Sequence, residues 1–283
     1  GGRFSADVAT SPAKFTKPTP PKEPKDATAE NVAKFNADLA KFQNALAGIK
    51  ELQQAHAAAM EKFHPKLGDY DVIVSNYNGD LWGQSFQADL EERLGSGKIG
   101  LVIVHAANNA FPGWKEYNRM IGMGWRGAGG GERLLLDDEG KSVRVKSGDG
   151  LGSGHRYVGP FNIVVRDASH PITKGMPLEW AHSRDELYDN MRGPIENVHL
   201  LATAYSYRDK KGTGVHEPMI WTVQYGKGRV FHTPMGHDVN AMLCVGFQVT
   251  LQRGTEWAAT GSVTVSIPPN FPTDKKVSVV PAP

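Results

Sequence analysis

Two short apolar runs with a helix-like segment between them constrain the fold most. Asp71–Val74 and Ile99–Val104 are continuous and rich in β-branched residues. Such runs are typical of strands buried on both faces of a parallel sheet. Between them, Ser85–Leu94 carries apolar residues at helical spacing and ends at Gly95. A strand, a helix and a strand at this spacing predict a βαβ crossover and therefore an α/β fold.

The composition excludes several classes of protein. The 283 residues include 32 Lys and Arg against 30 Asp and Glu, a formal net charge of +2, which argues against binding of nucleic acid. No apolar run reaches the roughly 18–20 residues of a membrane span. The single cysteine, Cys244, forbids an intrachain disulfide and any multi-cysteine metal site. The compartment stays open between the cytoplasm and a periplasmic or secreted location.

The chain before the first predicted strand differs in composition from the rest and predicts a connector followed by a helix. Thr10–Lys25 is rich in Pro and Lys, which predicts an extended connector. In Ala29–Phe63 the apolar residues recur at alternating spacings of three and four, which predicts one long helix with Thr28 as its N-cap and Pro65 as its stop. Its apolar stripe either packs on the parent domain or forms the seam of a homo-oligomer.

The later sequence extends the same fold. Val239–Gly254 predicts a final helix, and Tyr225–Arg229 predicts a hairpin turn and not a phosphate loop. Further strands are predicted at Phe161–Arg166, His199–Tyr205, Met219–Tyr225 and Arg229–Thr233. We therefore expect a single α/β domain over residues 1–265, in which residues 12–66 form a connector and a helical insertion. Residues 266–283 are expected to form an extended C-terminal tail.

Polar and aromatic residues follow the first two predicted strands. In open α/β sheets, ligands bind beyond the carboxyl ends of the strands. Polar groups interleaved with aromatic rings suit a sugar, although Asn and Gly at strand ends also simply build turns. The candidate substrate-binding residues here are Asn76, Tyr77, Asn78, Trp82, Asn109, Trp114 and Tyr117, with Trp125 as a further flat aromatic face.

His105 lies where a strand turns toward a helix. At this position the α/β hydrolases place a nucleophilic Ser or Cys. No Gly-x-Ser-x-Gly motif and no cysteine follows this strand. A histidine here can act as a general base or as a metal ligand, and a buried histidine without chemistry is the alternative.

The segment Trp180–Tyr188 concentrates a histidine, two carboxylates and a phenol. If it is helical, Asp185 shares one face with Tyr188, and His182, Asp185 and Glu186 also lie together. A carboxylate beside a hydroxyl and a histidine is suited to proton transfer. A solvated helix start has the same composition.

Two more histidines extend the candidate site. His237 follows a predicted strand and so lies at another carboxyl end, and His155 lies in the glycine-rich loop Gly148–Gly159, where it can contact substrate or form part of a lid. Together with His105 and Glu186, they are reasonable ligands for a divalent metal ion. They lack a recognised ligand spacing, so we assign no metal site from the sequence and keep a divalent metal only as an option.

Several motifs occur in a fixed order along most of the chain. They are Asp71–Val74 with Asn76–Gly79, Val104–Ala107 with Phe111, Trp114, Tyr117 and Ile121–Gly122, His170–Ile172, Asp185–Tyr188, Tyr225–Phe231, Gly236–His237, Gly246–Phe247 and Arg253–Gly261. In these motifs the stretch from Asp69 to Thr264 resembles the trehalose-utilisation (ThuA-like) family.

The resemblance implies a flavodoxin-like, glutamine-amidotransferase-like fold, with a mostly parallel sheet flanked by helices. It says nothing of the long helical insertion near the N-terminus. It also implies a link to disaccharide catabolism, including action on oxidised (keto) glycosides. Carried over position by position, the implied pocket residues are Asn76, His105, Asp185, Glu186, Tyr188 and His237.

The resemblance also raises an expectation about the start of the chain. Family members begin with a central strand and a helix, whereas this sequence begins at Gly1, and Arg3–Val8 resembles the family's second strand. We therefore expect either that the sequence is part of a longer polypeptide and lacks the central strand of the sheet, or that another segment takes the place of that strand.

Three hypotheses for function follow. The first is an enzyme that acts on a disaccharide or keto-glycoside by acid–base chemistry. The second is a non-catalytic carbohydrate-binding or scaffolding module, and the third is a metal-dependent hydrolase or lyase. An amidotransferase is disfavoured because no cysteine lies at the strand–helix turn. The catalytic candidates are His105, Glu186, His237 and Asp185, and His155 and Tyr188 join the substrate-binding residues. The expected partner is a small carbohydrate, with a homo-oligomer through residues 29–63 as an option.

Overall fold

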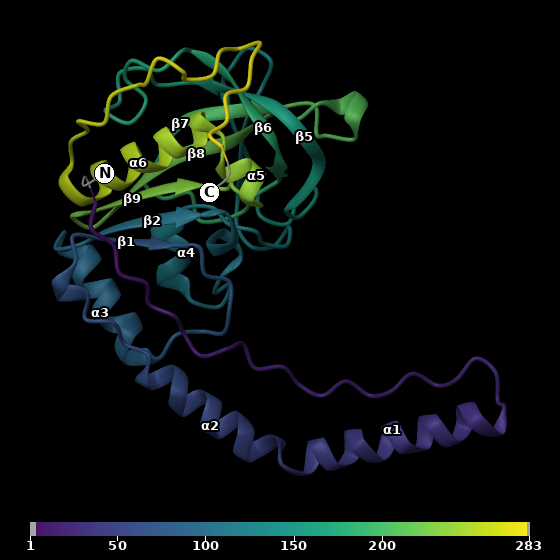
Figure 1. Ribbon diagram of the computed structural model, residues 1–283. Coiled ribbons are helices and arrows are strands. Elements are labelled where there is room, and N and C mark those ends of the chain that lie inside the picture. Colours follow the sequence, from purple (N-terminus) through teal and green to yellow (C-terminus); the bar gives the residue numbers. More distant parts are fainter. Residues whose placement is uncertain (1–3, 282–283) are drawn as a thin grey trace. The chain divides into compact units, whose positions relative to one another are not determined.

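The computed structural model describes residues 4–281 (Figure 1). These residues form two compact units. One unit comprises the described chain up to Pro65 together with Gly79–Ala88. The other comprises Lys66–Asn78 and the described chain from Asp89 onward, and it contains the sheet.

The sheet of the second unit is mixed. Its strands are β1 (Val72–Ser75), β2 (Gly100–Val104), β3 (Arg133–Leu136), β4 (Ser142–Val145), β5 (Gly154–Val165), β6 (Glu179–Asp189), β7 (Val198–Tyr205), β8 (His216–Tyr225) and β9 (Gly228–Thr233). Seven of the nine strands found among residues 4–281 lie in the order β1-β2-β9-β8-β7-β5-β6, and β3 joins β4 to β8. β1, the helix α3 (Gln84–Gly95) and β2 confirm the predicted βαβ crossover.

The expected mostly parallel sheet is confirmed only in part. The pairs β1–β2 and β2–β9 are parallel. The pairs β9–β8, β8–β7, β7–β5 and β5–β6 are antiparallel. The short turn between Tyr225 and Gly228 is the predicted hairpin, and strands joined by so short a turn can only pair antiparallel. The fold is therefore α/β with a parallel part and a larger antiparallel part.

Helices cover the sheet on both faces (Figure 1). α6 (Val245–Thr260) packs on β2 and β9, and α4 (Lys115–Ile121) packs on β8 and β9. Gly254 lets α6 approach closely, because a Cβ atom there would lie 2.4 Å from the ring of Phe231 in β9. The core between these layers contains fully buried Trp180, Trp221 and Phe231.

Three predicted elements need correction. The segment Trp180–Tyr188, considered as a helix, belongs to β6, because it pairs along its length with β5. The predicted loop Gly148–Gly159 is a strand from Gly154 onward. The predicted helix Val239–Gly254 is two helices, α5 (Val239–Met242) and α6, because the backbone becomes extended at Cys244 and forms a bridge with Val279.

Expectations about strand burial and the N-terminus also differ. β2 is buried along its whole length as predicted, but β1 is an edge strand in which Val74 is 50% exposed. Phe4–Val8 is not a strand, and Arg3 lies outside the described residues. β2 pairs directly with both β1 and β9, and β1 ends the order of the described strands, so the expected absence of a further strand from the given sequence stays a prediction.

The first unit contains two helices where one was predicted. α1 (Ala29–Ala47) and α2 (Ile49–Lys62) are separated by Gly48, whose φ of −98° and ψ of 7° interrupt the regular helix. The predicted N-cap is confirmed, since Thr28 Oγ1 accepts a hydrogen bond from the main-chain N–H of Asn31. The role of this region in a homo-oligomer stays a prediction.

The Pro-rich connector of the first unit has no helix or strand. The N–H of Phe15 donates to Asp80, and the carboxylate of Glu61 accepts from the N–H groups of Gln84 and Ser85 at the start of α3. Among the described helices none is both long and apolar enough to cross a membrane.

Candidate functional site

His105 occupies a strained position at the end of β2. It is the first residue of a 3₁₀ helix, His105–Asn109, so the predicted turn from strand to helix is confirmed. Its φ of +33° lies in a region that non-glycine residues rarely adopt. Such backbone strain concentrates at functional sites, because the surrounding fold must stabilise it.

The hydrogen bonds of His105 fix its tautomer. Nδ1 lies 2.8 Å from the carbonyl oxygen of Pro234, and because a carbonyl only accepts, Nδ1 must carry the proton. The other nitrogen, Nε2, then presents a lone pair. Burial lowers the pKa of His105, although Asp185 and Glu186 oppose the shift, so the ring is held neutral. A neutral imidazole can accept a proton or bind a metal ion.

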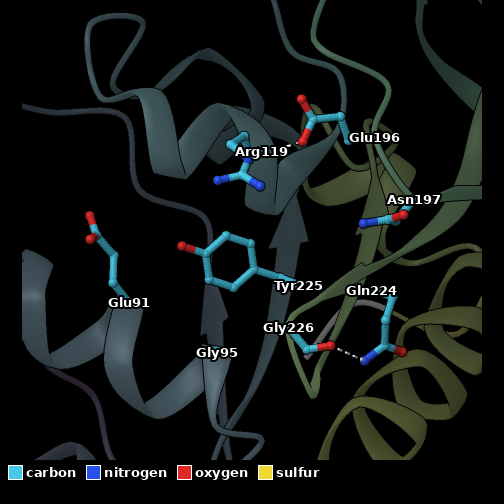
Figure 2. A pocket seen from close by; sticks show the side chains of 8 residues that line it. All are labelled: Glu91, Gly95, Arg119, Glu196, Asn197, Gln224, Tyr225 and Gly226. Carbon is cyan, nitrogen blue, oxygen red and sulfur yellow. Dashed lines mark hydrogen bonds and ion pairs between the residues drawn. The ribbon is translucent and has the colours of Figure 1, made fainter.

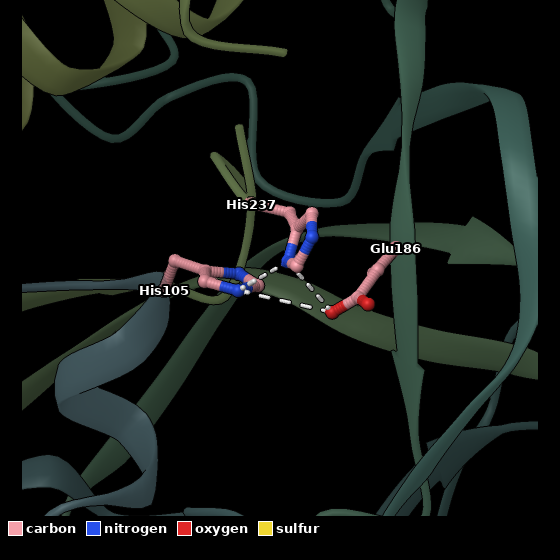
Figure 3. A group of neighbouring side chains, drawn as sticks. All are labelled: His105, Glu186 and His237. Carbon is pink, nitrogen blue, oxygen red and sulfur yellow. Dashed lines mark hydrogen bonds and ion pairs between the residues drawn. The ribbon is translucent and has the colours of Figure 1, made fainter. Parts of the chain in front are cut away.

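Three side chains converge on this lone pair, and Figure 3 shows two of them, His237 and Glu186, together with His105. His105 Nε2 lies 3.2 Å from Nδ1 of His237 and 3.8 Å from Oε2 of Glu186. His237 Nδ1 lies 3.1 Å from the same Glu186 oxygen. The hydroxyl of Tyr188 is 3.2 Å from His105 Nε2. We call His105, Glu186 and His237 the His–Glu–His cluster.

The sheet topology explains how the cluster forms. β2 and β9 are parallel neighbours, so their carboxyl ends meet at one edge of the sheet. His105 follows β2 directly, and His237 lies in the loop after β9. Glu186 reaches the same edge from β6, in the antiparallel part of the sheet.

Asp185 supports the loop that carries His237. Its carboxylate accepts from the main-chain N–H of Gly236 at 2.7 Å, of His237 at 3.1 Å and of Glu186 at 2.8 Å. It also lies 2.9 Å from Nε2 of His182, a fully buried ring. These four donors surround Asp185, which is 3% exposed.

A β-bulge brings His182 and Asp185 to the same face of β6. Gly159 pairs with Asp185, and Phe161 pairs with His182. Between these two pairs the chain advances by three residues in β6 but by only two in β5, which is a β-bulge in β6. Burial lowers the pKa of His182, but the interactions with Asp185 and with the thiol of Cys244 together outweigh it and raise the pKa to about 9. The two side chains therefore form a buried ion pair.

A hollow of about 280 Å³ adjoins the cluster. Its lining residues are Val158, Arg184, Asp185, Glu186, His237 and Asp238. His155 lies beside it, with Nε2 3.6 Å from Oε1 of Glu186. The indole of Trp125 packs on the rings of His155 and Tyr188, at centroid distances of 5.6 and 4.7 Å.

The other polar candidates lie around the same strand ends. Asn76 Oδ1 accepts from the N–H of Ala106 and so ties the loop after β1 to the turn at His105. The amide of Asn109 lies beside the hydroxyl of Tyr188. The ring of Tyr77 packs on Phe111, and Asn78 is exposed.

Three aromatic candidates do not offer open faces. Trp114 is 6% exposed and Tyr117 is 1% exposed, and both pack with Phe111. Trp82 belongs to the first unit, where its ring packs on Phe86. The partly exposed aromatic side chain that borders the cluster is Trp125. The sequence analysis named Trp125 as a flat aromatic face but did not include it among the candidate substrate-binding residues. The orienting role of the Pro234 carbonyl had no sequence signal.

A second hollow, of about 290 Å³, contains none of the candidate residues (Figure 2). Its charged side chains have partners: Arg119 lies 3.0 Å from Glu196, and Glu91 accepts a hydrogen bond from the indole N–H of Trp114 at 2.6 Å. Figure 2 shows Tyr225 between Glu91 and Arg119, which leaves little unpaired charge to attract a ligand.

The fold and the cluster define a class of protein: a mixed α/β domain with two histidines and a glutamate at the carboxyl edge of its parallel strands. The chain belongs to the ThuA family, described as trehalose utilisation, which matches residues 22–258. This membership connects the chain with trehalose utilisation and confirms the resemblance found in the sequence.

The chain is also similar to solved structures. A ThuA-like protein from Parabacteroides merdae is 42% identical, with a TM-score of 0.74, covering 78% of this chain and 81% of that chain. A ThuA-like protein from Bacteroides uniformis is 17% identical, with a TM-score of 0.49, covering 78% of this chain and 86% of that chain. No curated protein matches the chain.

Proposed function

We propose that the chain is a sugar-processing enzyme in which the His–Glu–His cluster is the reaction centre. The substrate is a disaccharide or a keto-glycoside. One observation carries the proposal: side chains from three distant parts of the sequence converge on one lone pair beside a hollow. A buried histidine with only a structural role would be satisfied by its own hydrogen bonds and would not need this convergence of titratable side chains.

The cluster is suited to proton transfer. His105 Nε2 is the base, because its lone pair is fixed by the bond from Nδ1 to Pro234. Glu186 lies between three imidazoles, since His155, His105 and His237 all approach its carboxylate within 3.8 Å. A proton taken from a sugar hydroxyl by one of these groups can be returned by another.

The surroundings of the cluster suit a sugar. Trp125 and His155 provide ring faces against which the C–H face of a sugar ring can pack, and Arg184 and Asp238 line the hollow with groups that bind hydroxyls. A volume of about 280 Å³ is at the small end of the range for ligand pockets, roughly 300–1,000 Å³. The hollow would therefore hold one end of a disaccharide.

A screen of oxidised and unoxidised disaccharides tests the proposal, with products detected by mass spectrometry. We expect H105Q and E186Q to reduce turnover at least about 100-fold, the usual effect of losing a general acid or base. H199Q is the matched control, because His199 also lies beside a carboxylate, Asp167, but is 55% exposed on β7.

Two outcomes of this screen would contradict the proposal. Unchanged turnover in H105Q, with the thermal unfolding midpoint preserved, would remove the cluster as the reaction centre. Sugar binding in calorimetry without any product, from every sugar and at every metal concentration, would indicate a carbohydrate-binding module instead.

A further inference from the structure

We propose that His105, Glu186 and His237 bind one divalent transition-metal ion, such as Zn²⁺. The inference rests on the proposed function because it takes the same cluster as the reaction centre, and it changes one role there. With an ion bound, the lone pair on His105 Nε2 is a metal ligand, and a water molecule on the ion would replace His105 as the base. The inference does not depend on which sugar is processed. The donor set, the spacing of the donor atoms and the orientation of the rings each support it.

The donor set is one that transition metals prefer. Two imidazole nitrogens and one carboxylate bind the ion in catalytic zinc sites and in non-haem iron sites. His105 offers Nε2, His237 offers Nδ1 and Glu186 offers Oε2, and these atoms all lie within 4.8 Å of one another. The carboxylate supplies a negative charge that offsets the charge of the ion.

The spacing of the donor atoms fits one ion. Ligands at about 2.0–2.2 Å from a tetrahedral ion lie about 3.3–3.6 Å from each other. The three distances in the cluster are 3.1, 3.2 and 3.8 Å. Small movements of the side chains would therefore place all three donors around a common centre.

The orientation of the ligands is also that of a metal site. A metal-bound histidine usually donates its other ring N–H to a carbonyl or carboxylate. His105 does so toward Pro234. His237 is held at its main-chain N–H by Asp185. The hollow borders Glu186 and His237, so a fourth coordination position faces it and would accept water or a sugar oxygen.

Hydrogen bonding alone serves the cluster less completely. His105 Nε2 and Glu186 Oε2 both accept, and a ring proton on His237 Nδ1 can serve only one of them at a time, with the Tyr188 hydroxyl as the further donor to His105 Nε2. A bound ion satisfies both acceptors at once. The proton of His237 then moves to Nε2 of a side chain that is 47% exposed, where water can solvate it.

The experiment is a competitive titration of tag-free, chelator-treated protein with Zn²⁺ against a fluorescent zinc indicator. We expect one ion per chain in the wild-type protein and in H199Q. In H105Q and E186Q we expect at least about tenfold weaker binding, because even groups that only support metal ligands cost 10–100-fold when lost. Mg²⁺, which avoids imidazole, should not compete.

Unfolding midpoints with and without Zn²⁺ give a second readout, since an ion that binds the native state raises the midpoint. The midpoint should rise in the wild type and in H199Q but not in E186Q. Zn²⁺ binding below one ion per chain, or equal binding in the wild type and in both cluster variants, would overturn the inference.

The metal inference and the proposed function can fail separately. If no Zn²⁺ binds through the cluster but the protein processes a sugar, the metal inference fails and the proposed function stands. If Zn²⁺ binds through the cluster but no sugar in the screen is processed, the proposed function fails and the metal site stands.

Discussion

Asp185 and Glu186 are consecutive residues of β6, but their carboxylates have different surroundings. Asp185 is enclosed by four hydrogen-bond donors, whereas Glu186 faces three imidazole rings at 3.1–3.8 Å. We therefore assign reactivity to Glu186 and propose that Asp185, one of the catalytic candidates, positions the loop of His237.

D185N tests this division of roles. We expect the free energy of unfolding to fall by about 3 kcal/mol, because the buried His182 loses its charged partner. Urea unfolding measures the loss, and amide exchange at Gly236 and His237 should become faster. D89N is the control, since Asp89 forms a partly exposed helical pair with Arg93 that contributes less than about 0.5 kcal/mol. Equal losses in both variants would contradict the assignment.

His232 should make the native state sensitive to acid. Its Nδ1 faces the carbonyl of Ile121, its Nε2 faces the amide of Asn108, and burial lowers its pKa to about 3. In the unfolded chain the pKa of His232 is near 6.5, so below that pH the unfolded state binds a proton at His232 that the native state does not bind. The free energy of unfolding therefore decreases as the pH falls from about 6.5 toward 3.

The comparison of H232Q with the wild type measures this contribution. Between about pH 6 and pH 4 the stability advantage of the wild type should shrink by up to about 1.4 kcal/mol per pH unit. Urea unfolding at each pH gives the two curves. Parallel curves over this range would show that His232 contributes no acid sensitivity.

G254A should destabilise the packing of α6 on β9. The new Cβ would lie 2.4 Å from the ring of Phe231, and such overpacking costs about 1–3 kcal/mol, against a gain of at most about 1 kcal/mol in helix propensity. Thermal unfolding should show a lower midpoint. G127A, where no atom lies within 4 Å of the added Cβ, should stay within about 0.5 kcal/mol of the wild type.

W125A should weaken sugar binding. Loss of the indole beside Tyr188 and His155 is expected to cost about 1.4 kcal/mol, a tenfold increase in Kd, for the sugar that the screen identifies. Calorimetry measures the change. W257A is the matched control, because Trp257 also packs on a histidine, His170, at 5.1 Å. Equal affinity in W125A and the wild type would remove Trp125 from the sugar site.

Much of the site could be predicted from strand ends. The apolar runs at Asp71–Val74 and Ile99–Val104 predicted a parallel pair, and a histidine after a buried strand lies at the ligand-binding edge whatever the rest of the sheet does. His105 and His237 followed from this rule. Glu186 and Tyr188 were predicted from the concentration of polar groups in Trp180–Tyr188 and again from the family resemblance, since strand ends alone did not identify them.

The antiparallel part of the sheet could not be predicted in the same way. Trp180–Tyr188 carries polar residues on both faces, which hides the alternation of a strand. Its buried polar groups are tolerated because His182 and Asp185 pair across a bulge whose position depends on β5. The break between α1 and α2 at Gly48 could not be predicted either, because isolated glycines are tolerated in helices and Gly48 alone does not indicate an interruption.

The 132 positions that separate His105 from His237 have a consequence for biosynthesis. A nascent chain emerging from the ribosome can pair β1 with β2 early, but β9 and the following loop emerge much later. Until then His105 has neither the Pro234 carbonyl that orients it nor the ring of its partner. The His–Glu–His cluster therefore forms only after the chain has been synthesised as far as His237, and a nascent chain that ends before this loop lacks the proposed reaction centre.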